Sequence, residues 1–166
     1  MKKIINPWTG MDGYLCYACS PANPSGLHME FYEDGDDIVS FWKPTGFQQG
    51  WLNTLHGGIQ CTLMDEVAGW TILRKLQTTG VTSKMEVRFI KNISTGDPQL
   101  TVRARIRDRK RNVVFIETEI RNAGEELCTR AEIIYFVASP EQAKAQFYFT
   151  GCRVEGEEDR QGMEEV

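Results

Sequence analysis

The sequence has no apolar run that approaches the roughly 18 residues needed for a membrane-spanning helix. Two lysines, Lys2 and Lys3, stand near the N-terminus, but no apolar stretch of signal-peptide length follows them. Positive charge is not in excess either, because 19 basic side chains oppose 23 acidic ones and the net charge is −4. Nucleic-acid-binding proteins usually present a basic face, so this balance argues against that role. We therefore expect a cytoplasmic protein that binds neither membranes nor nucleic acids.

The cysteines do not form a disulfide framework, because their number is odd, their spacing is irregular and no secretion signal is present. Cys16 and Cys19 have the two-residue gap found in metal and redox sites. A zinc site would need a second pair of ligands, and only His28 lies nearby. A redox motif would need a helix start where Pro21 follows. We interpret both as loop cysteines packed beneath the N-terminal segment, in preference to a metal site, and predict no metal. The others are Cys61, Cys128 and Cys152.

Composition divides the 166 residues into three parts around one domain. Residues 1–26 are rich in Pro, Gly, Asn and Ser and predict an irregular arm. Residues 27–150 carry the periodic segments and predict the folded domain. Residues 151–166 become rich in Glu, Asp and Gly and predict a disordered acidic tail.

Hydrophobic periodicity predicts an α+β domain with an antiparallel sheet on a central helix. The helix is apolar on every side, which is typical of a helix that is buried all round, and Gly80 is predicted to end it. Such a sheet leaves edge strands and an apolar rim, so we expect pairing with a second copy of the chain. The predicted strands cover 27–33, 38–43, 81–91, 99–107, 112–122 and 126–138, the helix covers 58–77, and 44–55 is predicted to be a loop.

Two features of the predicted helix suggest chemistry. Gly57 and Gly58 allow close approach to free N–H groups at its N-terminus, where developing negative charge is stabilised. Asp65 and Glu66 lie two turns further along, where a buried carboxylate needs a partner, a proton or a pocket. The alternative is a helix start that merely needs two glycines, with structurally satisfied acids. The combination favours acyl transfer to water, since it joins oxyanion donors to a base.

These residues resemble the signature of the hotdog-fold acyl-CoA thioesterases, and most closely the phenylacetate-degradation thioesterase-like subfamily. The resemblance is carried by Leu55-His56-Gly57-Gly58, Leu63-Met64-Asp65-Glu66 and Gly69-Trp70. Further matches occur at 23–27, 82–89 and 96–98, and the resemblance covers about residues 16–138.

The resemblance implies a curved antiparallel sheet wrapped around a central buried helix, assembled as homodimers or homotetramers with active sites between subunits. It implies hydrolysis of an acyl-CoA thioester to free acid and CoA, without a cofactor other than the CoA of the substrate. Asp65 matches the catalytic carboxylate, which acts as general base or nucleophile. Gly57 and Gly58 match the residues whose backbone N–H groups polarise the thioester carbonyl. His56 matches a residue that positions the loop or the thioester, and Thr82 matches a residue that holds the water.

One departure from the family pattern concerns a third polar group. Some relatives carry Asn or Gln where this chain has Gly50, and Asn53, Gln48 or Gln49 are the candidates to replace it, with Asn53 assigned to substrate binding. Glu66 is a second acid of the same helical arc and is also assigned to substrate binding. Asp65 is preferred as the working acid because of its position in the motif.

A basic cluster follows in the strand 99–107 and its hairpin. It can hold the phosphates of CoA, or it can be a solvated strand face on which Glu117 and Glu119 pair with Arg103 and Arg105. Pairing leaves the tip unexplained, and we assign the tip to CoA binding. The tip residues are Arg109, Lys110 and Arg111, next to Arg107.

Three functions remain open from the sequence. The first is the acyl-CoA thioesterase, which the double glycine after the histidine favours. The second is an acyl-thioester hydratase or dehydratase of the same fold that uses His56 and Asp65. The third is a non-catalytic acyl-CoA-binding protein.

Overall fold

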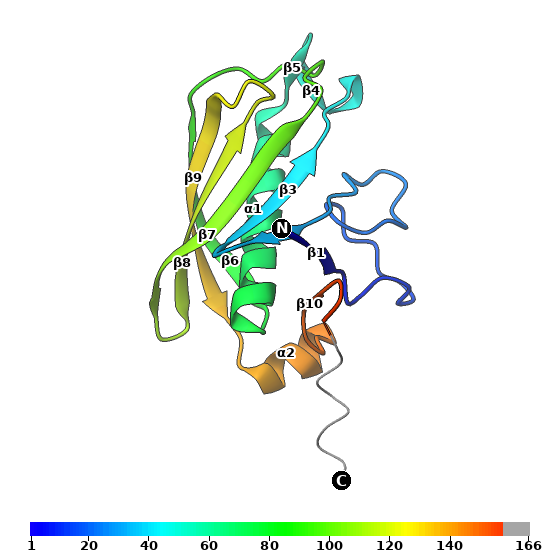
Figure 1. The fold of residues 1–166 in the computed structure, drawn as a ribbon, viewed down its shortest axis with the longest axis vertical. Helices are drawn as coiled ribbons and strands as arrows, with labels where there is room; N and C mark the ends of the chain where they lie inside the picture. The colour runs from blue at the N-terminus through cyan, green and yellow to red at the C-terminus, as the bar shows by residue number, and fades with distance from the viewer. Residues whose placement is uncertain (158–166) are drawn as a thin grey trace.

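The computed structural model describes residues 1–157, and the remainder of the predicted tail lies outside the described residues. An eight-stranded antiparallel sheet with the order β10-β1-β2-β3-β7-β8-β9-β6 curves around one long helix, α1 (Figure 1). The predicted α+β architecture is therefore confirmed. The sheet strands are β1 (Lys2–Ile5), β2 (Tyr32–Asp34), β3 (Asp37–Trp42), β6 (Gly80–Phe89), β7 (Leu100–Lys110), β8 (Val113–Arg121), β9 (Leu127–Val137) and β10 (Arg153–Val154). The remaining elements are η1 (Gly46–Gln48), β4 (Gln49–Trp51), β5 (Thr54–Leu55), α1 (Gly57–Leu76) and α2 (Pro140–Phe147).

The helix α1 packs one face against the sheet in its first half and is buried on nearly every side at residues 70–73. Leu63, Met64 and Val67 are fully buried, whereas Asp65 and Glu66 are only partly covered on the other face. The helix ends at Leu76, because Gln77 adopts a left-handed conformation with φ 52°. The prediction that Gly80 ends the helix was wrong. Gly80 begins β6 instead, and a Cβ there would lie 3.0 Å from the carbonyl oxygen of Phe136.

The alternation predicted for the long strands is confirmed in β8. Val114, Ile116 and Ile120 face the core and are fully buried, while the acidic side chains between them face outward. A tight turn joins β8 to β9, since the N–H of Glu125 donates to the carbonyl of Asn122 at 2.9 Å.

The N-terminal arm differs from its predicted irregular form at its start, because β1 pairs with β2 and β10. Of the strand predicted over 27–33, only its end lies in β2. Leu27 and Met29 instead donate their backbone N–H groups to the carbonyls of Tyr17 and Ala18. These bonds fold the arm back on itself and hold it beside the sheet.

The segment after the sheet contains more structure than predicted. The sequence analysis did not predict α2, although Ser139 and Gln142 form a capping box with Pro140 in the first turn, which is a readable signal. Arg153–Val154 forms β10, so the predicted disordered tail does not begin at 151. No helix within residues 1–157 is long and apolar enough to cross a membrane.

The strand β6 lies at one edge of the sheet and exposes apolar side chains. Val81 and Phe89 are each 54% exposed, and Ile90 follows directly. An exposed apolar edge of this kind is a surface on which another chain can pair. Association with a second copy stays a prediction.

Candidate active site

A pocket of about 560 Å³ opens between α1, the start of β6, the N-terminal arm and the end of α2. Asp65, Thr82 and Tyr135 lie together in its wall. Thr79 also lines it, and its buried hydroxyl has no hydrogen-bond partner among residues 1–157. A pocket of this volume suits a small-molecule ligand, and its polar groups converge at Asp65.

Two hydroxyl groups hold one oxygen of the Asp65 carboxylate. Oδ1 accepts hydrogen bonds from Thr82 Oγ1 at 2.7 Å and from the Tyr135 hydroxyl at 2.7 Å. No hydrogen bond in the described part of the chain reaches Oδ2. The carboxylate is therefore fixed through one oxygen and has its other oxygen available to a water or substrate atom.

Tyr135 was missed by the sequence analysis. It lies on β9 directly opposite Thr82 of β6, so the sheet register brings both hydroxyls to Asp65. Burial and the nearby charge of Asp65 raise the pKa of Tyr135, which keeps its hydroxyl protonated and able to donate. The readable signal was a tyrosine at an inward position of a buried strand, because a buried tyrosine hydroxyl needs a polar partner.

The sequence suggested that the N–H groups of both Gly57 and Gly58 are free at the start of α1, but only one of them is. His56 is the N-cap, and its Nδ1 accepts the N–H of Gly58 at 2.8 Å. Accepting through Nδ1 assigns the proton of the neutral ring to Nε2. The N–H of Gly57 has no acceptor within the described chain, so Gly57, rather than Gly58, is the donor left for a ligand.

One chain does not bring this amide to the acid. Gly57 and Asp65 are separated by two turns of α1, which corresponds to about 12 Å along the helix axis. A reacting carbonyl has to lie within hydrogen-bond reach of an oxyanion donor and close to the base or nucleophile. The two groups of a single chain are too far apart to act on the same carbonyl.

The missing third polar group has a steric explanation. A Cβ at Gly50 would lie 3.1 Å from Cδ2 and 3.2 Å from Cα of His56, a tight contact that Asn or Gln could make only if His56 moved by a few tenths of an ångström. The side chain of Gln48 is engaged in the cap of η1, where its Oε1 accepts from Thr45. Asn53 stands in a left-handed turn with φ 60° and is exposed.

Comparison with known proteins adds to this geometry. Residues 52–129 match the family model described as the thioesterase superfamily. Over these residues the chain is similar to thioesterase-superfamily domains. The matched segment holds the start of α1, Asp65 and Thr82. No curated protein matches the chain significantly.

Solved structures of thioesterase-superfamily proteins share the hotdog fold of this chain. A hypothetical thioesterase from Streptococcus pneumoniae with coenzyme A is 21% identical, with a TM-score of 0.62, and the match covers 67% of this chain and 89% of that one. A thioesterase from Haemophilus influenzae is 21% identical, with a TM-score of 0.65 and coverage of 74% and 86%. A Streptococcus mutans protein bound to acetyl CoA is 17% identical, with a TM-score of 0.61 and coverage of 67% and 89%.

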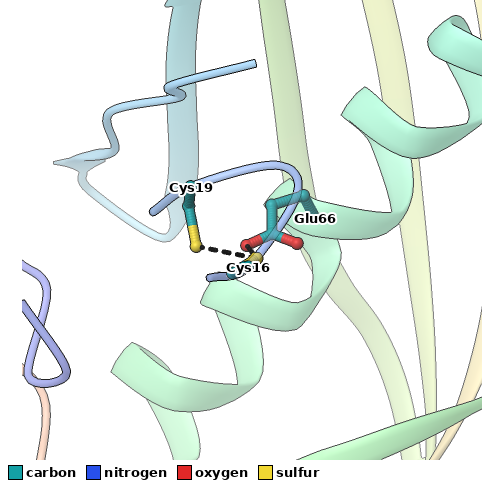
Figure 2. A group of neighbouring side chains, drawn as sticks. All are labelled: Cys16, Cys19 and Glu66. Carbon is teal, nitrogen blue, oxygen red and sulfur yellow. Dashed lines mark hydrogen bonds between the residues drawn. The ribbon is translucent and has the colours of Figure 1, made fainter. Parts of the chain in front are cut away.

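Glu66 is not part of the Asp65 network. It faces the arm, where Oε1 accepts from Trp70 Nε1 at 2.9 Å and lies 3.7 Å from Cys16 Sγ (Figure 2). Burial and the neighbouring Cys16 raise the pKa of Glu66 to about 7. A hydrogen bond from Cys19 lowers the pKa of Cys16 to about 5, while that same contact and burial raise the pKa of Cys19.

The basic residues of β7 separate into two groups. Arg105 lies opposite Glu117 as predicted and pairs with it at 3.1 Å. Arg103 lies opposite Glu119 but pairs with Asp34 and Asp37 of the neighbouring hairpin. The predicted pairing across the strand face therefore holds for Arg105. The charge of Arg103 is balanced instead by acidic residues outside β7 and β8.

The tip of the β7–β8 hairpin keeps its positive charge exposed. Arg109, Lys110 and Arg111 are all exposed, and Arg111 is in the left-handed turn with φ 58°. Lys110 is 3.7 Å from Asp108 and lies over the ring of Phe115. The hairpin projects beside the end of α1 where β6 begins (Figure 1).

Proposed function

We propose that the protein hydrolyses an acyl-CoA thioester to a free acid and CoA. The observation that carries this proposal is the Asp65 carboxylate, which Thr82 and Tyr135 hold through Oδ1 while Oδ2 is left available in the pocket. The similarity to thioesterase-superfamily domains and the two similar proteins that bind coenzyme A or acetyl CoA support it.

Asp65 acts in one of two ways on the thioester carbonyl. As a general base, it accepts a proton from water while the water oxygen attacks the carbonyl carbon. As a nucleophile, it attacks the carbon itself, and water then hydrolyses the anhydride. In both cases the carbon–sulfur bond breaks and the CoA sulfur leaves as a thiolate that takes a proton. Single turnover in ¹⁸O-water separates them, because only the nucleophilic route places ¹⁸O in the Asp65 carboxylate.

The oxyanion needs a donor that the same chain cannot bring to Asp65. We assign this role to the Gly57 N–H of a second copy, so that two chains build each site. The exposed apolar edge at β6 supports self-association, as do Phe47, Trp51 and Leu52 near the start of α1, which are 99%, 82% and 83% exposed. The assembly is a homodimer or a homotetramer of such pairs.

The remaining contacts are assigned to the CoA part of the substrate. Arg109, Lys110 and Arg111 supply exposed positive charge for its phosphates. Asn53 lies in the exposed turn just before the histidine and contributes a polar side chain at the substrate entrance. Glu66 is assigned to the side of the pocket formed by the arm, because its carboxylate is engaged there.

Two structures of the Streptococcus pneumoniae protein add one more supporting detail. One carries an aspartate-to-alanine replacement and the other a threonine-to-alanine replacement. The two positions are separated by nearly the same length of chain as Asp65 and Thr82 here. This correspondence supports the assignment of both residues to the site.

A free-thiol assay over short, medium, long and aryl acyl-CoAs tests the proposal, with Asp65→Asn as the matched variant. We expect thiol release by the wild-type protein and loss of most turnover in the variant, with an unchanged circular dichroism spectrum. Near-wild-type hydrolysis by the variant would contradict the assignment. A change at the substrate double bond without thiol release would indicate a hydratase, and binding without turnover would indicate a binding protein.

A further inference from the structure

The turn that carries Cys16 and Cys19 meets the middle of α1 at Glu66, and the proposed hydrolysis does not use this contact (Figure 2). The two Sγ atoms and a carboxylate oxygen all lie within 4.8 Å of one another. The three residues come from parts of the chain 50 positions apart, so the fold brings them together. We propose that Cys16, Cys19 and Glu66 bind a thiophilic divalent cation, of which Zn²⁺ is the reference ion.

The spacing of the ligand atoms suits a tetrahedral ion. Zinc binds sulfur at about 2.3 Å and carboxylate oxygen at about 2.0–2.2 Å, so ligand atoms around one ion lie about 3.5–3.8 Å apart. Here the two Sγ atoms are 3.3 Å apart, and Cys16 Sγ is 3.7 Å from Oε1 of Glu66. These two separations differ from the ideal ones by at most a few tenths of an ångström, and the third pair, Cys19 Sγ and the Glu66 carboxylate, lies within 4.8 Å.

A bound cation would also balance the charge that its ligands carry. Two thiolates and a carboxylate, which is the form that binds metal, would place three negative charges in a largely covered position. None of the ion pairs within residues 1–157 involves Glu66, and no lysine or arginine reaches it. Buried charges are normally paired or bound to a metal, and a divalent cation supplies the missing partner.

The surroundings orient the ligands before any ion arrives. Trp70 Nε1 donates to Oε1 of Glu66 at 2.9 Å, and the Tyr14 hydroxyl lies 2.9 Å from Cys19 Sγ. The N–H of Ser20 bonds to the carbonyl of Cys16 at 3.1 Å and closes the turn between the cysteines. Such outer partners are the usual support of metal ligands. Cys16, Cys19 and Glu66 line the pocket that also holds Asp65, so a solvent molecule from that pocket would supply a fourth ligand.

The bound ion would fasten the N-terminal arm to α1 one residue from Asp65. This role is independent of the proposed hydrolysis, since a non-catalytic chain with the same three ligands would bind the ion equally. The tests therefore measure metal binding and stability, not turnover.

Metal content of the full-length protein, purified under reducing conditions and incubated with Zn²⁺, gives the first test. We expect one Zn²⁺ per chain after desalting and a higher melting temperature than in chelator-treated protein. Replacement by Co²⁺ is expected to give the visible bands of a tetrahedral ion and a near-ultraviolet thiolate charge-transfer band. Absence of stoichiometric Zn²⁺ together with absence of the cobalt bands would overturn the proposal.

Variants locate the ion. The double variant Cys16→Ser, Cys19→Ser is expected to lose at least about 100-fold in Zn²⁺ affinity, because even outer partners contribute about 10- to 100-fold. Glu66→Gln keeps an acceptor for Trp70 but removes the charge, and a loss of at least about tenfold is expected. Cys61→Ser, a partly buried cysteine of the same helix, is the matched control and should bind like the wild type.

Two outcomes of the variant series would contradict the site. Equal Zn²⁺ affinity in the double variant and the wild type would show that the ion does not bind at Cys16 and Cys19. A Cys16–Cys19 disulfide that forms in air, combined with no Zn²⁺ binding by the reduced protein, would make the cysteines a redox pair instead.

Discussion

The hydroxyl of Tyr135 lies 2.7 Å from Oδ1 of Asp65 and 2.8 Å from the backbone carbonyl oxygen of the same residue. A side chain at the end of β9 thus holds both the carboxylate and the helix backbone that carries it. The contact fixes the direction in which the free oxygen of Asp65 faces.

We predict that Tyr135→Phe lowers kcat about 10- to 100-fold and changes KM little, because a hydrogen bond to a charged group contributes about 1.5–3 kcal/mol. Steady-state kinetics with a short acyl-CoA measure the effect. Thr71→Val removes a buried hydroxyl on α1 that, among residues 1–157, bonds to the carbonyl of Val67 alone, and it serves as the control. Equal losses in the two variants would reduce the Tyr135 contact to a packing role.

Gly57→Pro tests the free amide. Proline removes the N–H, and the first helical position tolerates it because its fixed φ suits a helix start. The preceding His56 already has the extended ψ of 133° that a residue before proline requires. We expect at least a 100-fold loss in kcat, as is typical for an oxyanion donor.

Gly57→Ala is the matched control, because it adds a Cβ but keeps the N–H. A Cβ there would lie 3.4 Å from the ring of Phe89, an ordinary contact that both variants share. If the proline variant turned over substrate as fast as the alanine variant, the Gly57 N–H would have no role in catalysis.

Mixing variants tests whether two chains build each site. Subunits with Gly57→Pro and subunits with Asp65→Asn are each expected to be inactive alone. After unfolding and refolding at a 1:1 ratio, one site in each mixed dimer is intact, and activity should return to roughly a quarter of wild type. The chain that carries both substitutions, mixed with wild type, provides the reference. No recovery in the first mixture would place the amide and the acid of one chain in the same site.

Replacing Arg109, Lys110 and Arg111 together by Gln is expected to raise KM for acyl-CoA about tenfold or more, with a much smaller change in kcat. The KM of the wild type should also rise with salt concentration more steeply than that of the variant, since exposed charges are screened. Lys2, Lys43 and Lys144 are exposed elsewhere, and their triple Gln variant is the control. An unchanged KM in the hairpin variant would show that these residues do not bind CoA and only form the solvated end of the strands.

Glu33 links the sheet to the end of α1 and makes stability dependent on pH. Burial acts to raise its pKa, but the hydrogen bonds from Arg74 and Lys75 outweigh this effect and lower the pKa. A lowered folded-state pKa stabilises the fold above the unfolded value near about 4.3, and that stability is lost as the pH falls through the folded value.

Glu33→Gln is therefore expected to lower the free energy of unfolding at pH 7 by about 1–2 kcal/mol, as measured by urea denaturation. The difference from the wild type should disappear in acid. Glu86→Gln, which breaks the exposed pair with Lys84, is the control and should change little. A gap of the same size at pH 7 and pH 3 would contradict the ion-pair explanation.

The sequence predicted the central helix and the four long strands because their periodicity extends over many residues. Asp65 and Thr82 could be named because they stand in a local motif and in a strand with a recognisable start. Tyr135 could not, because its role depends on the register that sets it opposite Thr82.

The other differences also arise from contacts between distant segments. Glu66 was considered with its helix neighbours, whereas the folded arm brings Cys16 to it from 50 residues away. Gly57 and Gly58 could not be distinguished from their sequence, since the difference is a hydrogen bond to the ring of His56. The helix α2 had a readable start signal, but its eight residues are too few to show a clear helical periodicity, and it was missed.

The walls of the pocket have two origins. Asp65 and Thr82 lie inside the segment that matches the superfamily model, residues 52–129, whereas Trp8, Tyr14 and Tyr148 line the same pocket from outside it. Trp8 joins the two outer segments, because its Nε1 donates to the carbonyl of Phe147. The shape presented to an acyl group thus comes largely from parts of the chain that can change in evolution without disturbing the acid. Under the proposed function, the substrate preference of this protein can therefore differ from that of similar proteins while Asp65 and Thr82 are kept.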